Sequence, residues 1–148
     1  MTDLWWLGCL ASAAPILAVG LYSIFFFSDS ISPDEAGTLV LATTERPRPR
    51  NGVLVPLSVR MLCIAIPTEL AARLVILMSA ILGIVVTFFI GNLVRDAAVG
   101  MIAALFLTLN PWYWMMSNRI LLDVPATAAC AACVYSLLLF TTTGDARY

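Results

Sequence analysis

The sequence predicts an all-helical integral membrane protein with about four transmembrane helices, which form a single transmembrane domain over residues 1–148. The 148 residues are 61% hydrophobic and only 11% charged, and the mean hydropathy is +0.97. Soluble domains carry about 25% charged residues, so this chain has too few charges to cover a surface exposed to water. The apolar residues also gather in long runs, which is the pattern of membrane-spanning helices.

Four apolar runs have lengths suited to crossing a bilayer. A helix needs roughly 20 apolar residues to cross a hydrocarbon core of about 30 Å. The runs are bounded by polar or helix-breaking residues and extend from Leu4 to Phe27, from about Leu70 to Leu93, from about Ala97 to Trp114 and from about Val124 to Phe140. Any one of them is compatible with a buried helix of a soluble domain, but four in so short a chain favour a membrane protein.

The first run is interpreted as a retained span and not as a cleaved signal peptide. It lacks a basic segment before the apolar stretch, since Asp3 is its only early charge, and it is longer than the apolar core of a typical signal peptide. Pro15 lies inside this run and is expected to kink the helix, which membrane helices tolerate when neighbours satisfy the freed carbonyl.

The segment from Ser28 to Thr68 is expected to form a long loop that contains short helices. Ser32 followed by proline and two acids is a helix-start signal, so a helix is predicted from Pro33 to about Thr43. The stretch from Val53 to Ile66 is apolar but too short to span. It suits an interfacial or re-entrant helix that ends at Pro67.

The charged residues limit the chemistry available to this chain. It has eight arginines, no lysine and no histidine, and its net charge is −1. Without histidine it has no histidine-ligated metal site and no Ser-His or Cys-His pair of its own, which excludes most hydrolase and protease mechanisms. The sequence contains no basic patch of the kind that binds nucleic acid.

Two acidic positions are expected to meet at one membrane surface. With four spans, the first and third loops lie on the same face, so Asp34 and Glu35 after the first span lie on the side of Asp123, which precedes the fourth. A carboxylate at the hydrocarbon boundary is costly unless it faces a polar cavity, a cation or a protein partner. This convergence favours a functional cleft, although ordinary interfacial acids at helix ends would give the same pattern.

Several short motifs follow one another in an order that is similar to a known family. They are Asp34-Glu35 at the opening of the long loop, Ala72-Arg73-Leu74 in the second run, Asn110-Pro111 at the end of the third, and the segment from Ser117 to Asp123 before the fourth. Together they resemble the amino-terminal part of the GT-C glycosyltransferases. The closest resemblance is to the branch of the dolichyl-phosphate-mannose–protein mannosyltransferases and the bacterial lipid A aminoarabinose transferases.

The resemblance implies a mannosyltransferase-like enzyme that uses a polyprenyl-phosphate sugar donor on the non-cytoplasmic face of a prokaryotic plasma membrane or the endoplasmic reticulum. Asp34 would then be the catalytic base that takes the proton of the acceptor hydroxyl. Glu35 and Asp123 are expected to orient the acceptor or to position a divalent cation. Arg119 is expected to bind the donor phosphate, and Arg73 to contribute to substrate binding.

Two features depart from the family pattern. Thr38 and Leu39 stand where an aromatic residue often follows the acidic pair, and family members continue through several further spans. The chain is therefore expected to be an amino-terminal portion, a degraded copy, or one subunit that works with other membrane subunits or a carboxy-terminal part. Two other hypotheses stay open, namely a non-catalytic small membrane subunit of a larger complex and an unrelated four-span transporter or scaffold.

The arginines and the resemblance give opposite indications of membrane orientation. The acidic face also carries most of the basic side chains, at Arg46, Arg48, Arg50 and Arg119. The positive-inside rule would place such a face in the cytoplasm, whereas the resemblance implies the opposite side. We follow the resemblance because one long loop supplies most of this excess, and its arginines can attract a donor phosphate or anionic membrane lipid.

Overall fold

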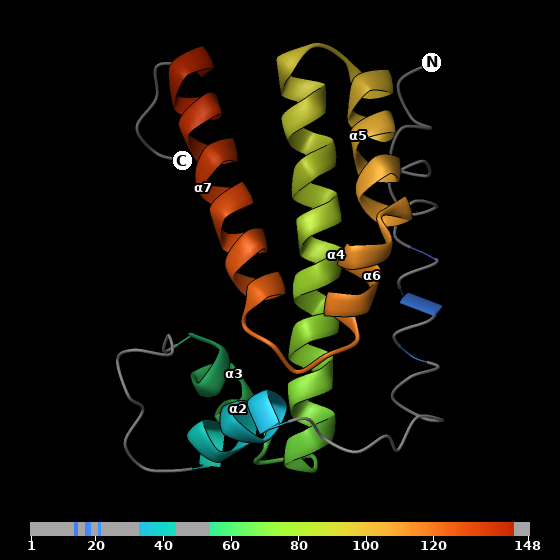
Figure 1. Ribbon diagram of the computed structural model, residues 1–148. Helices are drawn as coiled ribbons and strands as arrows, with labels where there is room; N and C mark the ends of the chain where they lie inside the picture. Colours follow the sequence, from blue (N-terminus) through green and yellow to red (C-terminus); the bar gives the residue numbers. More distant parts are fainter. Residues whose placement is uncertain (1–13, 15–16, 19–20, 22–32, 44–53, 144–148) are drawn as a thin grey trace.

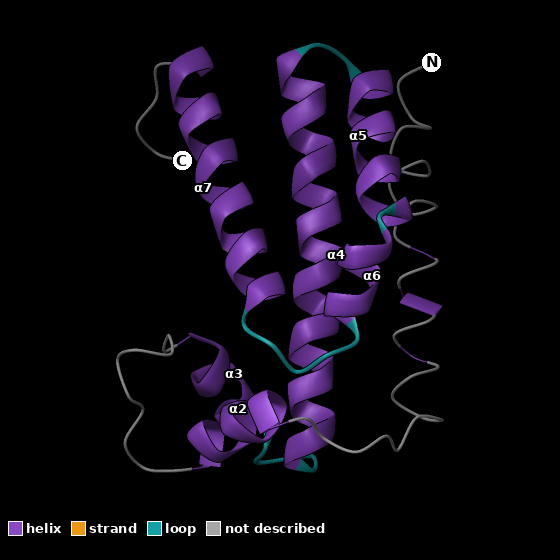
Figure 2. Cartoon of the chain, in the orientation of Figure 1, coloured by secondary structure: helices purple, strands orange, loops and turns teal. Residues whose placement is uncertain are grey.

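The computed structural model describes residues 33–43 and 54–143, together with the isolated positions 14, 17, 18 and 21. These residues form helices joined by short loops, with no strand among them (Figure 2). In chain order the helices are α2 (Pro33–Thr43), α3 (Leu54–Leu62), α4 (Thr68–Val94), α5 (Ala97–Leu109), α6 (Pro111–Ser117) and α7 (Asp123–Thr143). The all-helical prediction is confirmed for this part of the chain.

Helix α4 is the centre of the arrangement. It packs against α5 and α7 along its length, while α2 and α3 lie beside its first turns at one end (Figure 1). Its 27 residues give a length of about 40 Å, so α4 continues past the loop that joins α6 to α7 (Figure 1). This extension is where the α2–α3 pair packs.

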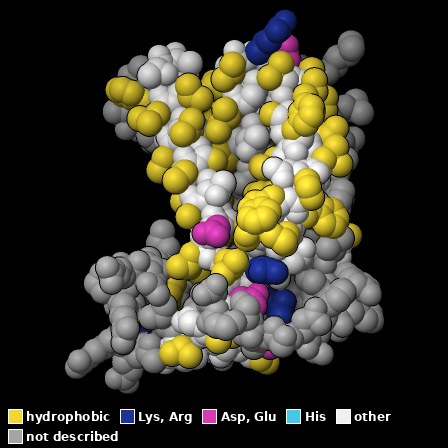
Figure 3. All heavy atoms as spheres, in the orientation of Figure 1, with side chains coloured by type: hydrophobic (Ala, Val, Ile, Leu, Met, Phe, Trp, Pro, Cys, Tyr) yellow, Lys and Arg dark blue, Asp and Glu magenta, His cyan; other side chains and the backbone are white. Residues whose placement is uncertain are grey.

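Among the described residues, two helices, α4 and the Asp123–Thr142 part of α7, are long and apolar enough to cross a membrane. The number is three if α5 and α6 together form one bent span. The outer surface of these helices is largely hydrophobic in Figure 3, and charged side chains gather toward the two ends. Apart from four isolated positions, the predicted first span, Leu4 to Phe27, lies outside the described residues, as do residues 28–32 and 44–53 of the predicted loop, so the total of four spans stays a prediction.

The predicted third span, Ala97 to Trp114, is not one straight helix. It breaks at Asn110 into α5 and α6, which are bent by 68°. Pro111 has no amide hydrogen and cannot continue the helix, so a new helix starts there. The side chain of Asn110 caps this start, because its Oδ1 accepts the amide hydrogen of Trp112 at 2.9 Å.

The turn between α4 and α5 lies at Arg95 and Asp96, between the predicted second and third runs. Asp96 caps α5 by accepting the amide hydrogen of Val99 at 2.9 Å. Close to this turn the two backbones nearly touch, since a Cβ added to Gly91 would lie 2.6 Å from the Cα of Gly100. Glycine at both positions allows the two helices to form a tight antiparallel pair.

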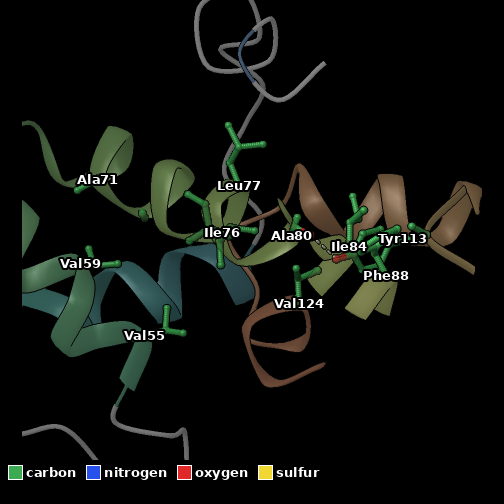
Figure 4. Packing of buried hydrophobic residues seen from close by; sticks show 13 residues of the cluster. Val55, Val59, Ala71, Ile76, Leu77, Ala80, Ile84, Phe88, Tyr113 and Val124 are labelled. Atoms are coloured by element: carbon green, nitrogen blue, oxygen red, sulfur yellow. Dashed lines mark hydrogen bonds between the residues drawn. The ribbon is translucent and has the colours of Figure 1, made fainter. Parts of the chain in front are cut away.

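A second close approach fixes α6 against α4. Tyr113, which is 8% exposed, points from α6 into the hydrophobic cluster next to Ile84 and Phe88 (Figure 4). Its hydroxyl donates a hydrogen bond of 2.8 Å to the carbonyl of Ala80, and the space that it needs exists because residue 83 is glycine. Tyr113 therefore faces the interior of the protein, in contrast to its neighbour Trp112, which is 63% exposed.

Candidate functional site

Helix α2 carries a buried carboxylate to the end of the helical bundle. The helix begins at Pro33 as predicted, and both acids of the pair lie in its first turn. Glu35 is only 9% exposed, and its Oε1 accepts the amide hydrogen of Ile120 at 3.0 Å. The two residues are 85 positions apart, so this bond joins the start of α2 to the loop between α6 and α7.

Burial makes this hydrogen bond important for the local structure. The side chain of Ile120 is completely buried, and a buried carboxylate is costly unless hydrogen-bond donors satisfy it. A hydrogen bond to a charged group contributes about 1.5–3 kcal/mol, more than a neutral one. Glu35 therefore holds the α6–α7 loop in place, and its expected role toward the acceptor or a cation stays a prediction.

The α6–α7 loop is ordered by its own backbone hydrogen bonds. The amide of Arg119 donates to the carbonyl of Met116 at 3.2 Å, and the amide of Leu121 donates to the carbonyl of Arg119 at 2.9 Å. The side chains of Arg119 and Asp123 are both exposed, on either side of the buried Ile120. The loop thus presents a cation and a carboxylate at the end of the bundle where α2 is attached.

Asp34 precedes Glu35 in the first turn of α2, and its side chain lies outside the described part of the chain. Its backbone adjoins Glu35, whose side chain accepts the hydrogen bond from Ile120 of the α6–α7 loop. Three of the predicted site residues, Glu35, Arg119 and Asp123, therefore belong to segments that contact one another, and Asp34 is adjacent in sequence to that contact.

Arg73 has a partner within its own helix. Its Nη2 and Nε atoms lie 3.0 Å and 3.1 Å from Oε1 of Glu69, one turn earlier in α4. The side chain of Arg73 is 13% exposed and that of Glu69 is 47% exposed, so the pair is open to solvent on the glutamate side. Glu69 was not predicted as a site residue, although the spacing of four positions from glutamate to arginine is the usual signal for such a pair.

Charged side chains of the described residues also gather around this end of the molecule in Figure 3, below the hydrophobic surface of the long helices. Within the part of the chain that the structure describes, no three cysteine, aspartate or glutamate residues come close enough together to hold a metal ion. The remaining predicted contributors, Arg46, Arg48 and Arg50, lie outside the described residues.

Comparison with known proteins adds no assignment to this geometry. No family model matches the chain, and no curated protein and no solved structure matches it either.

Proposed function

We propose that this chain is a membrane glycosyltransferase of the GT-C type, or the amino-terminal module of one. In this role it transfers a sugar from a polyprenyl-phosphate donor to an acceptor hydroxyl on the non-cytoplasmic face of the membrane. The observation that carries the proposal is the hydrogen bond from the amide of Ile120 to Glu35. It attaches the helix that begins with the acidic pair to the loop that carries Arg119 and Asp123, and these are the segments that the family resemblance assigns to one site.

The proposed reaction uses the charges at this end of the bundle. The oxygen of the acceptor hydroxyl forms a bond to the anomeric carbon of the sugar, and the bond from that carbon to the phosphate oxygen breaks. The hydroxyl proton passes to the carboxylate of Asp34, and the polyprenyl phosphate leaves with the electron pair of the broken bond. Arg119 is exposed and can pair with the phosphate oxygens as negative charge develops there.

Native mass spectrometry of the full protein, extracted gently from its own membrane, tests this proposal. The expected spectrum shows the chain, alone or with a second membrane subunit, carrying a mass increment that fits a polyprenyl phosphate sugar. Asp34→Asn should increase the fraction of protein that retains the intact donor, because transfer is blocked while donor binding is not. Arg119→Ala should lower this fraction.

Arg95→Ala is the matched control, because Arg95 is an exposed arginine at the opposite end of α4. This variant should retain the donor like the unmodified protein. If the unmodified protein and all three variants carry only bulk phospholipid, the glycosyltransferase proposal is wrong.

A non-catalytic role in a larger membrane complex is the second candidate function. The observation in its favour is the exposure of α7. Only 11% of the membrane-length apolar stretch of α7 is buried in this chain, compared with 44% of the corresponding stretch of α4. Such a helix can pack against another membrane subunit. Under this hypothesis Asp34→Asn has no effect on donor retention, while a bulky polar residue in place of the exposed Leu137 releases a protein partner in the same spectrum.

A further inference from the structure

Helix α3 uses one of its faces to pack on the rest of the molecule. Val55 is 6% exposed and Val59 is fully buried, and both belong to the hydrophobic cluster that includes Ala71 and Ala72 of α4 (Figure 4). Residues four positions apart lie on the same side of a helix, so this buried face is continuous. This face of α3 is therefore covered by other residues of the same chain.

The opposite face of α3 is also apolar. Leu57 is 50% exposed and Met61 is 65% exposed, and Ile64, in the turn that follows the helix, is 85% exposed. Leu57 and Met61, four positions apart, lie about half a turn around the helix from Val59, and Ile64 follows them in the turn after the helix. We call Leu57, Met61 and Ile64 the outer stripe. Single exposed apolar residues are ordinary, but three large ones that follow one another along a short helix and the turn after it indicate a non-aqueous environment.

The depth of α3 follows from the helix on which it packs. Residues 74–94 of α4 contain no charged side chain and are bracketed by Arg73 and Arg95. At 1.5 Å per residue this stretch is about 31 Å long, close to the thickness of a hydrocarbon core of about 30 Å. The turns of α4 before Arg73, against which α3 packs, thus lie at the level where the hydrocarbon ends and the lipid headgroups begin.

One charged residue of α3 borders the outer stripe. Arg60 is exposed and lies three positions after Leu57 and four before Ile64. An arginine at this depth can keep its aliphatic part among the acyl chains while its guanidinium reaches lipid phosphate. The combination of large apolar residues with an adjacent arginine matches the chemistry of an anionic lipid surface.

We propose that the outer stripe is a lipid-binding face, which inserts into the headgroup–acyl boundary of the membrane that α4 crosses, with Arg60 contacting the phosphate of an anionic lipid. The proposal depends on α4 crossing a bilayer and does not depend on sugar transfer. It refines the expectation of an interfacial or re-entrant helix over Val53 to Ile66, because a helix that ends at Leu62 with one face on α4 lies on the boundary and does not dip into the core.

Spin labelling of the full chain tests this proposal. A nitroxide is attached to Met61→Cys in a cysteine-free background, and the protein is reconstituted into vesicles of phosphatidylethanolamine and phosphatidylglycerol. Collision of the label with oxygen, which concentrates in lipid, is compared with collision with a water-soluble nickel chelate. A label on Leu137→Cys of α7 is the lipid reference, and one on Arg95→Cys is the water reference, since both side chains are exposed.

We expect the label at position 61 to collide with oxygen much more than with nickel, as the Leu137 reference does. Nickel accessibility equal to that of the Arg95 reference would overturn the proposal, because the stripe would then face water. Low collision with both reagents would also overturn it, because another protein surface would then cover the stripe. Leu57→Cys repeats the measurement on the same stripe in case the Met61 variant fails to fold.

The role of Arg60 is tested by comparing vesicles with and without an anionic lipid. Arg60→Gln should move the label at Met61 toward water in vesicles that contain phosphatidylglycerol, and should leave its depth unchanged in vesicles of phosphatidylcholine alone. If Arg60→Gln leaves the depth of the label at position 61 unchanged in both lipid compositions, Arg60 does not contact lipid phosphate.

Discussion

Replacing Glu35 by alanine is predicted to release the α6–α7 loop from α2. In the structure the carboxylate accepts the amide hydrogen of Ile120 at 3.0 Å, with Glu35 only 9% exposed and Ile120 not exposed at all. Alanine leaves this buried amide without its acceptor, which costs about 1–3 kcal/mol. Glutamine keeps an oxygen acceptor but loses the charge, so we expect about half of that cost.

Hydrogen exchange followed by mass spectrometry, with the protein in lipid nanodiscs, measures this effect locally. Because about 1.4 kcal/mol corresponds to a factor of ten, a loss of about 2 kcal/mol predicts roughly thirtyfold faster exchange in peptides that cover residues 118–122. Glu69→Ala is the control, since this exposed acid pairs only within α4 and should leave the loop unchanged. Unchanged exchange in Glu35→Ala would refute the reasoning and remove the main support for the proposed site.

Two further predictions concern the close approaches to α4, and thermal unfolding followed by helical circular dichroism in detergent checks both. Gly91→Ala should destabilise the protein by about 1–3 kcal/mol, because the new methyl group would overlap the backbone of α5. Gly37→Ala, with nothing near the added Cβ, should be neutral or slightly stabilising, and equal effects at both glycines would contradict this explanation. Gly83→Ala should also destabilise, because its Cβ would lie 2.6 Å from the hydroxyl of Tyr113. Combining it with Tyr113→Phe should cost less than the sum of the two single changes, and additive costs would place the strain elsewhere.

Local sequence signals were sufficient for several elements. The proline after Ser32 and the acids that follow placed the start of α2 at Pro33, as the structure has it. The long apolar runs placed α4 and α7 within a few residues, because charges bound them at Arg95 and Asp123. These features depend on residues that are close together in the chain, and such features are the ones that a single sequence specifies best.

Features that depend on distant contacts were not predicted. Asn110 and Pro111 are a known signal for a helix break, but the apolar residues on both sides favoured a continuous span. The inward orientation of Tyr113 depends on the absence of a side chain at Gly83, and no local pattern links these two positions. The sequence placed Glu35 in the acidic pair, but its burial against Ile120 depends on how α2 packs, which the periodicity of α2 alone does not determine.

The break at Asn110 also determines the depth of the candidate site. Measured from the turn at Asp96, the 13 residues of α5 descend about 20 Å, and the 7 residues of α6, bent by 68°, add only about 4 Å. The α6–α7 loop therefore lies about 24 Å from that turn, near the far boundary of a hydrocarbon core of about 30 Å. A straight helix of the same 20 residues would be about 30 Å long and would end at this boundary, whereas the bent one ends about 6 Å short of it. This depth fits the proposed membrane-bound donor, because the phosphate of a polyprenyl-phosphate sugar lies at the headgroup level of the bilayer.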